Sequence, residues 1–141
     1  MSQRRDPAST PFFRLSIDTG TLGYFNTCSG LSAQVETEQR QEGGNNGFVW
    51  QFPTRVTFSN ITLTRPVTED SVKIAKWISS IRTGMVRPTA AITALRADKS
   101  EIVTWSLLDV FPVRWEAPGF EPGGASVALE TLELAHHGFA D

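Results

Sequence analysis

The stretch that most constrains the fold of this chain is residues 126–138, Ser-Val-Ala-Leu-Glu-Thr-Leu-Glu-Leu-Ala-His-His-Gly. Apolar and β-branched residues at close spacing, preceded by the Pro-Gly-Gly run of residues 122–124 and closed by Gly138, are typical of a strand between turns. Apolar residues occur at both the odd and the even positions of this stretch, and these positions lie on opposite faces of a strand. We therefore expect both faces to be covered, as in a barrel wall or at a subunit contact. The residues expected to make an inter-subunit strand are Val127, Leu129, Leu132 and Leu134.

Length and composition indicate one domain of ordinary size. The chain has 141 residues, 40% hydrophobic and 20% charged, with a formal net charge of -2. This balance favours neither nucleic acid nor an anionic membrane surface as a partner. We expect a flexible N-terminal arm over residues 1–11, which are polar and contain two prolines, and a single domain over residues 12–141.

The sequence predicts assembly in the cytoplasm and no membrane anchoring. The first residues lack the apolar run of a signal peptide, and no segment approaches the roughly 20 apolar residues that cross a bilayer. Cys28 is the single cysteine, so no internal disulfide can form, and one thiol with two histidines is too few for a zinc site of ordinary spacing. We therefore expect no metal and no cofactor.

Most of the chain shows strand patterns. Alternation over residues 12–18, a short run over 24–28, and a pair over 91–96 and 102–108 joined by a turn at 98–100 each predict strands. Residues 107–115 continue the pattern, with Pro112 at a bend or an edge. Residues 56–63 predict a further strand, with a bulge near Ser59 and Asn60 because its apolar positions change parity there.

One helix is predicted between these strands. Ile74, Trp77, Ile78 and Ile81 recur at helical spacing, after Thr68 or Asp70 as a cap and before Gly84 as a stop. Strands with a single helix predict a mainly β fold, a small barrel or sandwich of two packed sheets with one flanking helix.

A long hairpin is predicted over residues 31–52. Its outgoing strand alternates between a core side and a polar side, and its tip, Glu-Gly-Gly-Asn-Asn-Gly at residues 42–47, is typical of a turn or an extended loop. The return limb is so apolar that we expect it to reach another surface; the alternative is that it folds back onto its own core. The residues of this candidate stacking loop are Glu42, Gly43, Gly44, Asn45, Asn46, Gly47, Phe48 and Trp50.

No catalytic constellation stands out, so the chain is not predicted to be an enzyme. His136 and His137 are adjacent in a strand and point to opposite faces, which favours packing or hydrogen bonding over metal binding. Cys28 is expected to be a small buried apolar group, since no histidine lies near it in sequence. Glu36 and Glu38 fall on one solvated strand face, where nothing favours acid–base work.

Glu130 lies on an apolar side of its strand. A carboxylate there needs a cation or several hydrogen bonds to offset its desolvation, so a structural ion pair is favoured over a catalytic acid. The candidate partners are Arg65, Lys76 and Arg114.

Several fragments, in this order, resemble the tube proteins of contractile phage tails and of related contractile injection systems, including the Hcp-like proteins. Phe-Asn-Thr-Cys-Ser-Gly-Leu begins at Phe25, Glu-Gly-Gly-Asn-Asn follows, and Asn-Ile-Thr-Leu-Thr-Arg begins at Asn60. The other fragments are Trp77, Trp105, residues 111–115, residues 128–136 and Gly138. His137 departs from the family, because many relatives carry an acid there.

The resemblance implies a barrel-like subunit, six copies of which form a ring, with rings stacked into a tube that conducts DNA or a protein effector into a target cell. The hairpin would reach the adjacent ring, and the polar side of its outgoing strand would be a candidate channel lining. The implied partners are a contractile sheath, baseplate or spike proteins, tube-terminating proteins and cargo. The implied location is a phage virion or a tail-like particle that can be released. The candidate lining residues are Gln34, Glu36, Glu38 and Arg40.

Two other functions stay open at this point. One is a free hexameric ring that carries or chaperones effectors of a secretion system, and the other is a monomeric ligand-binding β-barrel. The sequence does not separate a phage tail from an injection particle.

Overall fold

The five-stranded sheet forms around β1 (Phe12–Ile17), whose alternation turns Leu15 into the core. The structure, a computed structural model, describes residues 11–18, 20–40, 50–84, 88–117 and 128–140. Every pairing in this sheet is antiparallel, in the order β11-β8-β7-β1-β2. The other members are β2 (Gly20–Phe25), β7 (Ala90–Leu95), β8 (Glu101–Leu107) and β11 (Phe139–Ala140).

The four-stranded sheet packs against the first and carries much of the core. Its order is β3-β6-β10-β9, again antiparallel. Leu63 and Leu132 face each other across two of its strands and are fully buried. Its members are β3 (Thr27–Ser29), β6 (Ile61–Pro66), β9 (Phe111–Glu116) and β10 (Leu129–Ala135).

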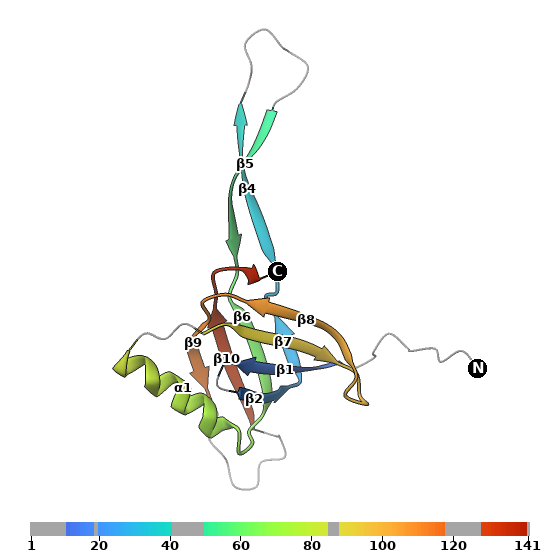
Figure 1. Cartoon of the computed structure of the whole chain (residues 1–141), viewed down its shortest axis with the longest axis vertical. Helices are drawn as coiled ribbons and strands as arrows, with labels where there is room; N and C mark the ends of the chain where they lie inside the picture. Colours follow the sequence, from blue (N-terminus) through green and yellow to red (C-terminus); the bar gives the residue numbers. More distant parts are fainter. Residues whose placement is uncertain (1–10, 19, 41–49, 85–87, 118–127, 141) are drawn as a thin grey trace, which may run out of the picture.

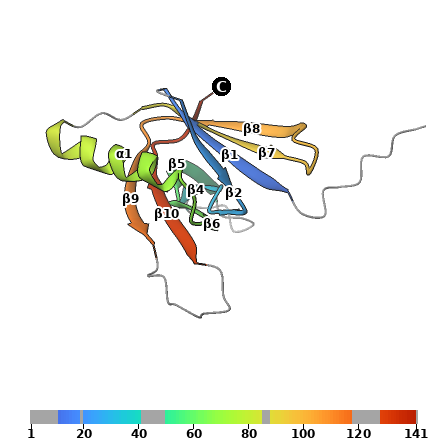
Figure 2. The ribbon, with the colours of Figure 1, turned by 90° about the horizontal axis from the view of Figure 1, so that it is seen from below.

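Helix α1 (Ser71–Thr83) lies along the side of this sandwich (Figure 1; Figure 2). It buries Ile74 and Trp77, in agreement with the predicted helical spacing. Asp70 takes the cap position but makes no side-chain cap hydrogen bond, while Thr68 Oγ1 accepts from the backbone nitrogen of Asp70 at 3.2 Å. The two packed sheets and the flanking helix confirm the predicted fold class.

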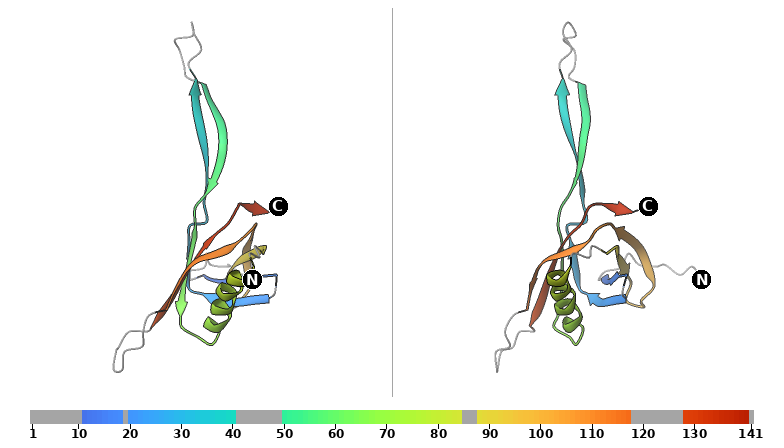
Figure 3. Two further views of the ribbon diagram at one scale, coloured as in Figure 1. Left: turned by 90° about the vertical axis from the view of Figure 1, so that its left-hand side faces the viewer. Right: turned by 60° about the vertical axis from the view of Figure 1, so that its left-hand side comes forward.

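The third sheet is a two-stranded ribbon that stands out from the body. It consists of β4 (Ala33–Arg40) and β5 (Trp50–Phe58), which pair only with each other among the described residues. Figure 1 and Figure 3 show it extending away from the sandwich along the long axis of the molecule. The alternative that this hairpin folds back onto its own core is therefore wrong.

Two strand predictions need correction. Residues 56–63 are not one strand with a bulge: β5 ends at Phe58, and β6 begins at Ile61 in a different sheet. The short strand over residues 24–28 is likewise divided, because β2 ends at Phe25 and β3 begins at Thr27 in the four-stranded sheet. The strand predicted to close at Gly138 is confirmed as β10, and after Gly138 the chain passes to the other sheet as β11. Gly138, with φ +127, lies at this change of sheet and makes it possible.

Some predictions fall on residues that the structure does not describe. These are the arm over residues 1–10, the loop residues 42–48, and Val127. Within the described residues, no helix has the length and apolar character needed to span a membrane.

Candidate functional site

The ribbon contains a register shift that decides which residues share a face. Glu36 pairs with Arg55, but the next residue, Thr37, pairs with Pro53, so Thr54 is an extra residue on β5. The Thr54 hydroxyl donates to the carbonyl oxygen of Glu36 at 2.9 Å. Proline lacks a backbone N–H, and a bulge is one of the few places where a strand accepts it.

The core-side face of the ribbon carries Ala33, Val35, Val56 and Phe58, which pair directly across the two strands. Phe58 packs on His136 and Phe139, with ring centroids 5.4 and 5.6 Å apart, so this face continues toward the inside of the sandwich. Further out, Val35 and Val56 are 51% and 50% exposed. The predicted core side of this strand is thus half exposed at Val35 and Val56.

The polar-side face carries the candidate channel lining. Gln34 pairs with Thr57, and Glu36 pairs with Arg55, whose Nε lies 2.5 Å from Glu36 Oε2. Beyond the bulge, Glu38 pairs with Phe52 on this same face, and Arg40 is the backbone register partner of Trp50. The two aromatic rings stack with centroids 6.5 Å apart.

The polar-side face continues the outer surface of the four-stranded sheet. Because Phe58 turns toward the inside of the sandwich, Thr57 and Gln34 lie on the outer side. At the junction, Asn60 Nδ2 donates to Glu133 Oε2 at 2.8 Å. Two cross-strand rows form this outer surface: Thr27, Thr64, Thr131 and Glu116, then Ser29, Thr62, Glu133 and Arg114.

Inside the sandwich, Glu130 pairs with Arg65. The two side chains are 0% and 2% exposed, and Arg65 Nε donates to Glu130 Oε2 at 2.8 Å. Of the other two candidates, Arg114 pairs with exposed Glu116 at 2.8 Å, and Lys76 is an exposed residue of α1. The pairing follows from the register, because Arg65 lies directly opposite Glu130 on adjacent strands.

Glu130 and Arg65 also join elements of different layers. Glu130 accepts from Ser71 Oγ at the start of α1 at 2.9 Å and from Trp115 Nε1 on β9 at 2.6 Å. Arg65 Nη1 donates to the carbonyl oxygen of Leu22 on β2 at 2.8 Å, and its guanidinium lies 4.2 Å from the centre of the Phe25 ring. These bonds link both sheets and the helix around one buried ion pair.

The expected inter-subunit strand is corrected by the pairing of β10. Both of its edges are occupied within one copy, by β6 and by β9. Leu132 and Leu134 are fully buried in the core of the sandwich, because they face inward. Of the four predicted residues, Leu129 is described as exposed and remains open to a neighbour, while Val127 is outside the described residues.

The cysteine and the histidines take structural positions. Burial raises the pKa of the Cys28 thiol to about 11, which keeps it protonated and unreactive. His136 is buried and its Nδ1 accepts from the backbone nitrogen of Gly138 at 3.1 Å. His137 is exposed, with Nδ1 3.3 Å from Asp109 Oδ2. The strand position predicted for both histidines is wrong, because they lie in the connection between β10 and β11.

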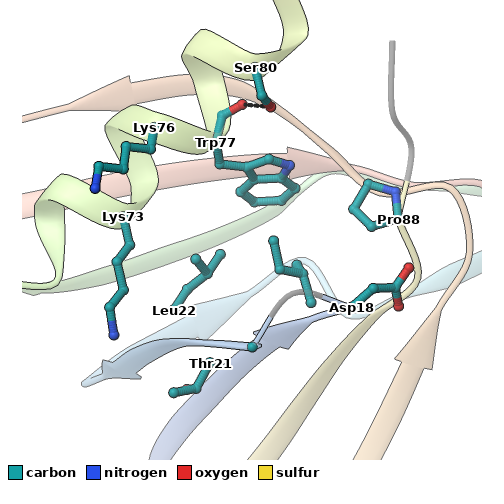
Figure 4. A pocket seen from close by; sticks show the side chains of 10 residues that line it. Asp18, Thr21, Leu22, Lys73, Lys76, Trp77, Ser80 and Pro88 are labelled. Atoms are coloured by element: carbon teal, nitrogen blue, oxygen red, sulfur yellow. Dashed lines mark hydrogen bonds between the residues drawn. The ribbon is translucent and has the colours of Figure 1, made fainter. Parts of the chain in front are cut away.

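A groove of about 650 Å³ lies between α1 and the β1–β2 end of the five-stranded sheet (Figure 4). Leu22 and Trp77 line it, and Lys73 and Lys76 reach along the helix side. Lys73 is paired with Asp70 at 3.1 Å. The Ser80 hydroxyl, which also lines the groove, donates to the carbonyl oxygen of Trp77 at 2.6 Å.

A family model matches nearly the whole of this chain. Residues 9–140 match the family model described as T4-like virus tail tube protein gp19. This chain is a member of that tail tube family. The match covers nearly the whole chain, and it confirms the resemblance drawn from the sequence fragments.

Several solved structures share the fold of this chain. One is the PVC sheath-tube complex of an extracellular contractile injection system in its extended state, with TM-score 0.80 and 21% identity over 99% of this chain and 97% of that chain. Another is the six-fold symmetrised baseplate of the anti-feeding prophage, with TM-score 0.71 and 22% identity over 99% and 96%. A more distant one is Hcp1 from Salmonella typhimurium, with TM-score 0.52 and 14% identity over 90% and 82%. No curated protein matches.

As a member of this family, the chain is a structural tube subunit. Alternation in the sequence predicted the polar side of the outgoing hairpin strand, but the two cross-strand rows that form the threonine-rich outer surface of the four-stranded sheet were not predicted. Their signal was present in the alternation of threonine with buried residues over residues 61–65, which reads Ile-Thr-Leu-Thr-Arg.

Proposed function

We propose that copies of this chain form hexameric rings that stack into a tube, with the threonine-rich outer surface and the polar-side face of the ribbon lining the channel. The observation that carries the proposal is the continuity of these two surfaces. A polar surface that runs from the body onto a projecting ribbon would line a channel without interruption from one ring to the next. Gln34, Glu36, Glu38 and Arg40 would be the ribbon's share of that lining.

Ring formation is favoured by the edges of the four-stranded sheet. Within the described part of the chain, β3 and β9 are each paired on one side only. Exposed strand edges are templates for further pairing, so β9 of one copy could join β3 of the next and extend the sheet around a ring. The related baseplate structure is described as six-fold symmetrised, which agrees with six copies in such a ring.

Ring stacking is assigned to the ribbon and to the loop beyond it, residues 42–48 together with Trp50. An isolated two-stranded ribbon has marginal stability in water, and its exposed valines and aromatics favour a cover. The neighbouring ring would supply that cover. The role is structural, and catalysis forms no part of the proposal.

The partners follow from the solved relatives. These solved structures are described as a sheath-tube complex, a sheath/tube terminator, a tube-terminating cap and a baseplate of contractile injection systems. We propose that this chain likewise assembles in the cytoplasm into a particle with a sheath, a baseplate and a terminator. Its channel would conduct DNA or a protein effector, and the particle could be released from the cell.

Two single-cysteine variants test which surface faces the channel. Thr27→Cys places a thiol on the threonine-rich surface, and Thr104→Cys places one on the outer face of the five-stranded sheet, both in a Cys28→Ser background. Both positions are exposed in one copy of the chain, so they are matched. The measurement is reaction with a polyethylene glycol maleimide too large to enter a narrow channel, before and after assembly.

The proposal predicts that assembly protects Thr27→Cys and leaves Thr104→Cys reactive. Protection should be lost when the tubes are dissociated. The reverse pattern, or equal reactivity of both variants in assembled tubes, would place the channel on another surface.

A further inference from the structure

Two short connections join the ribbon to the sandwich, and the side-chain hydrogen bonds of these connections lie at the surface. Ser59 Oγ donates to the carbonyl oxygen of Gly30 at 3.1 Å, and the hydroxyl oxygens of Ser32 and Ser59 lie 2.5 Å apart. These bonds join one connection to the other. Asn60 ties the connection to the body, since its Nδ2 donates to Glu133 Oε2 at 2.8 Å. Hydrogen bonds that compete with water contribute only modest net stability, so these bonds alone fix the direction of the ribbon weakly.

Three rings pack together at the base of the ribbon, on its core-side face. Phe58 is the last residue of β5, His136 follows β10, and Phe139 begins β11. The ring of Phe58 lies 5.4 Å from that of His136 and 5.6 Å from that of Phe139, and the last two rings are 5.4 Å apart, centroid to centroid. We call these three residues the aromatic joint. The joint packs one ring of the ribbon against two rings from the segment in which the chain passes between the sheets of the sandwich.

His136 is the most buried ring of the joint, with 7% of its surface exposed. Its Nδ1 accepts from the backbone nitrogen of Gly138 at 3.1 Å, which fixes the orientation of the imidazole and places its hydrogen on Nε2. Nε2 is buried and has no hydrogen-bond partner among the described residues. The ring is therefore held by Gly138 on one side and by its two aromatic neighbours on the other.

Phe58 also lies directly on the backbone of Gly138. A Cβ added at this glycine would be 3.1 Å from Cε2 and from Cζ of the Phe58 ring, closer than ordinary van der Waals contact. The ribbon thus contacts both the turn at Gly138 and the imidazole that this turn orients. Packing against two fixed groups opposes a swing of the ribbon, because a swing would open both contacts.

We infer that His136 positions the ribbon: its ring, oriented by Gly138, holds Phe58 so that the ribbon has one direction already in the single subunit. The inference rests on the proposed stacking role, because it says what prepares the ribbon for that role. A segment that is ordered before it binds loses less conformational entropy on binding, and it needs no conformational change to bind. A ribbon with a fixed direction therefore joins a growing stack faster than a ribbon that swings.

Two substitutions at His136 separate its ring from its hydrogen bond. His136→Asn removes the ring but keeps an acceptor for the Gly138 N–H, because the asparagine Oδ1 is attached to Cγ as Nδ1 is in histidine. His136→Phe keeps a ring and removes the acceptor. Phe58→Ala removes the ring of the ribbon and keeps the test available where His136→Asn does not fold. Phe13→Ala is the matched control, since Phe13 is also a half-buried phenylalanine but packs on the core from β1, outside the joint.

Pulsed electron paramagnetic resonance on dissociated subunits measures the direction of the ribbon. One nitroxide is attached at Gln51 on β5 and the other at Thr104 on β8, both of which are exposed, in the Cys28→Ser background. The width of the distance distribution between the two labels reports how far the ribbon swings. Thermal unfolding verifies that each variant is folded.

The chain with an intact joint should give one narrow distance distribution. His136→Asn and Phe58→Ala should at least double its width, whereas His136→Phe and Phe13→Ala should leave the width unchanged. An unchanged width in His136→Asn would overturn the inference, as would broadening in His136→Phe alone, which would assign the role to the hydrogen bond. A broad distribution with the joint intact, or equal broadening in Phe13→Ala, would also overturn it.

Tube growth provides a second readout, one that a loss of stability alone does not explain. At equal subunit concentration, His136→Asn should elongate tubes at least five-fold more slowly than His136→Phe, as followed by light scattering and electron micrographs. Equal rates would overturn the claim that stacking uses a fixed direction of the ribbon. If the unsubstituted chain forms no tubes, the proposed function fails, while the distance distributions still decide whether His136 positions the ribbon.

Discussion

Arg65 and Glu130 lie directly opposite each other on adjacent strands and form an ion pair of 2.8 Å in the interior of the sandwich. Three further elements contribute hydrogen bonds to this pair: β2 through Leu22, α1 through Ser71 and β9 through Trp115. Buried charges are retained only when they are paired and hydrogen-bonded. The pair therefore fixes how the two sheets and the helix meet.

Replacing Glu130 by alanine should leave the Arg65 guanidinium buried without its counter-ion. We expect a loss of about 3–5 kcal/mol in the free energy of unfolding, measured by urea denaturation of dissociated subunits. Glu116→Ala is the control, because its partner Arg114 is exposed and a surface pair contributes at most about 1 kcal/mol. A loss of less than 1 kcal/mol for Glu130→Ala would show that the buried pair does not hold the sheets together.

A methyl group at Gly23 should also disturb this pair. Its Cβ would press on Arg65 Nη1 and lie 2.7 Å from Asp70 Oδ2, and its φ of +109 strains any L side chain. Gly20 has a φ of +136 but open space around its Cβ, so Gly20→Ala isolates the backbone strain, about 1–3 kcal/mol. Gly23→Ala should lower the melting temperature more than Gly20→Ala does, and equal shifts would contradict the close approach.

The Cys28 thiol should react slowly with iodoacetamide. Because its pKa is about 11, the fraction of Cys28 in the thiolate form near pH 8 is roughly a hundredth of that of a free cysteine. The rate should rise as pH approaches 11, which mass spectrometry can follow in the folded protein. Because the folded pKa lies above the unfolded value, this group also favours the folded state below about pH 9, and that contribution is lost as pH rises through 11. A rate at pH 8 equal to that of glutathione would contradict the burial of Cys28.

Local patterns were sufficient to predict the main elements. The spacing of Ile74 and Trp77 predicted α1, and the alternation of residues 12–18 predicted β1. Glu130 was identified as a buried carboxylate because its strand side is apolar, but its partner among three cations required the register between β6 and β10. The alternation in a sequence predicts which face of the sheet a residue occupies, but it does not predict which residue lies opposite it on the adjacent strand.

The ribbon shows what these local patterns could not predict. The alternation of Val35 with polar residues predicted a core side, yet Val35 stays half exposed and no described residue covers this face. A hydrophobic pattern shows that a face needs cover and does not show which molecule provides it. The bulge was also placed wrongly, near Ser59 and Asn60, because a change of sheet produces the same parity change along the sequence.

The most direct test of the account is electron microscopy of the purified chain beside a variant that lacks residues 43–47, the tip of the hairpin. Both proteins should have the same melting temperature, because the sandwich does not depend on that tip. We predict long tubes for the intact chain and, for the variant, single rings or dissociated subunits. Long tubes formed by the variant would contradict the stacking role of the ribbon, as would an intact chain that stays monomeric at every concentration.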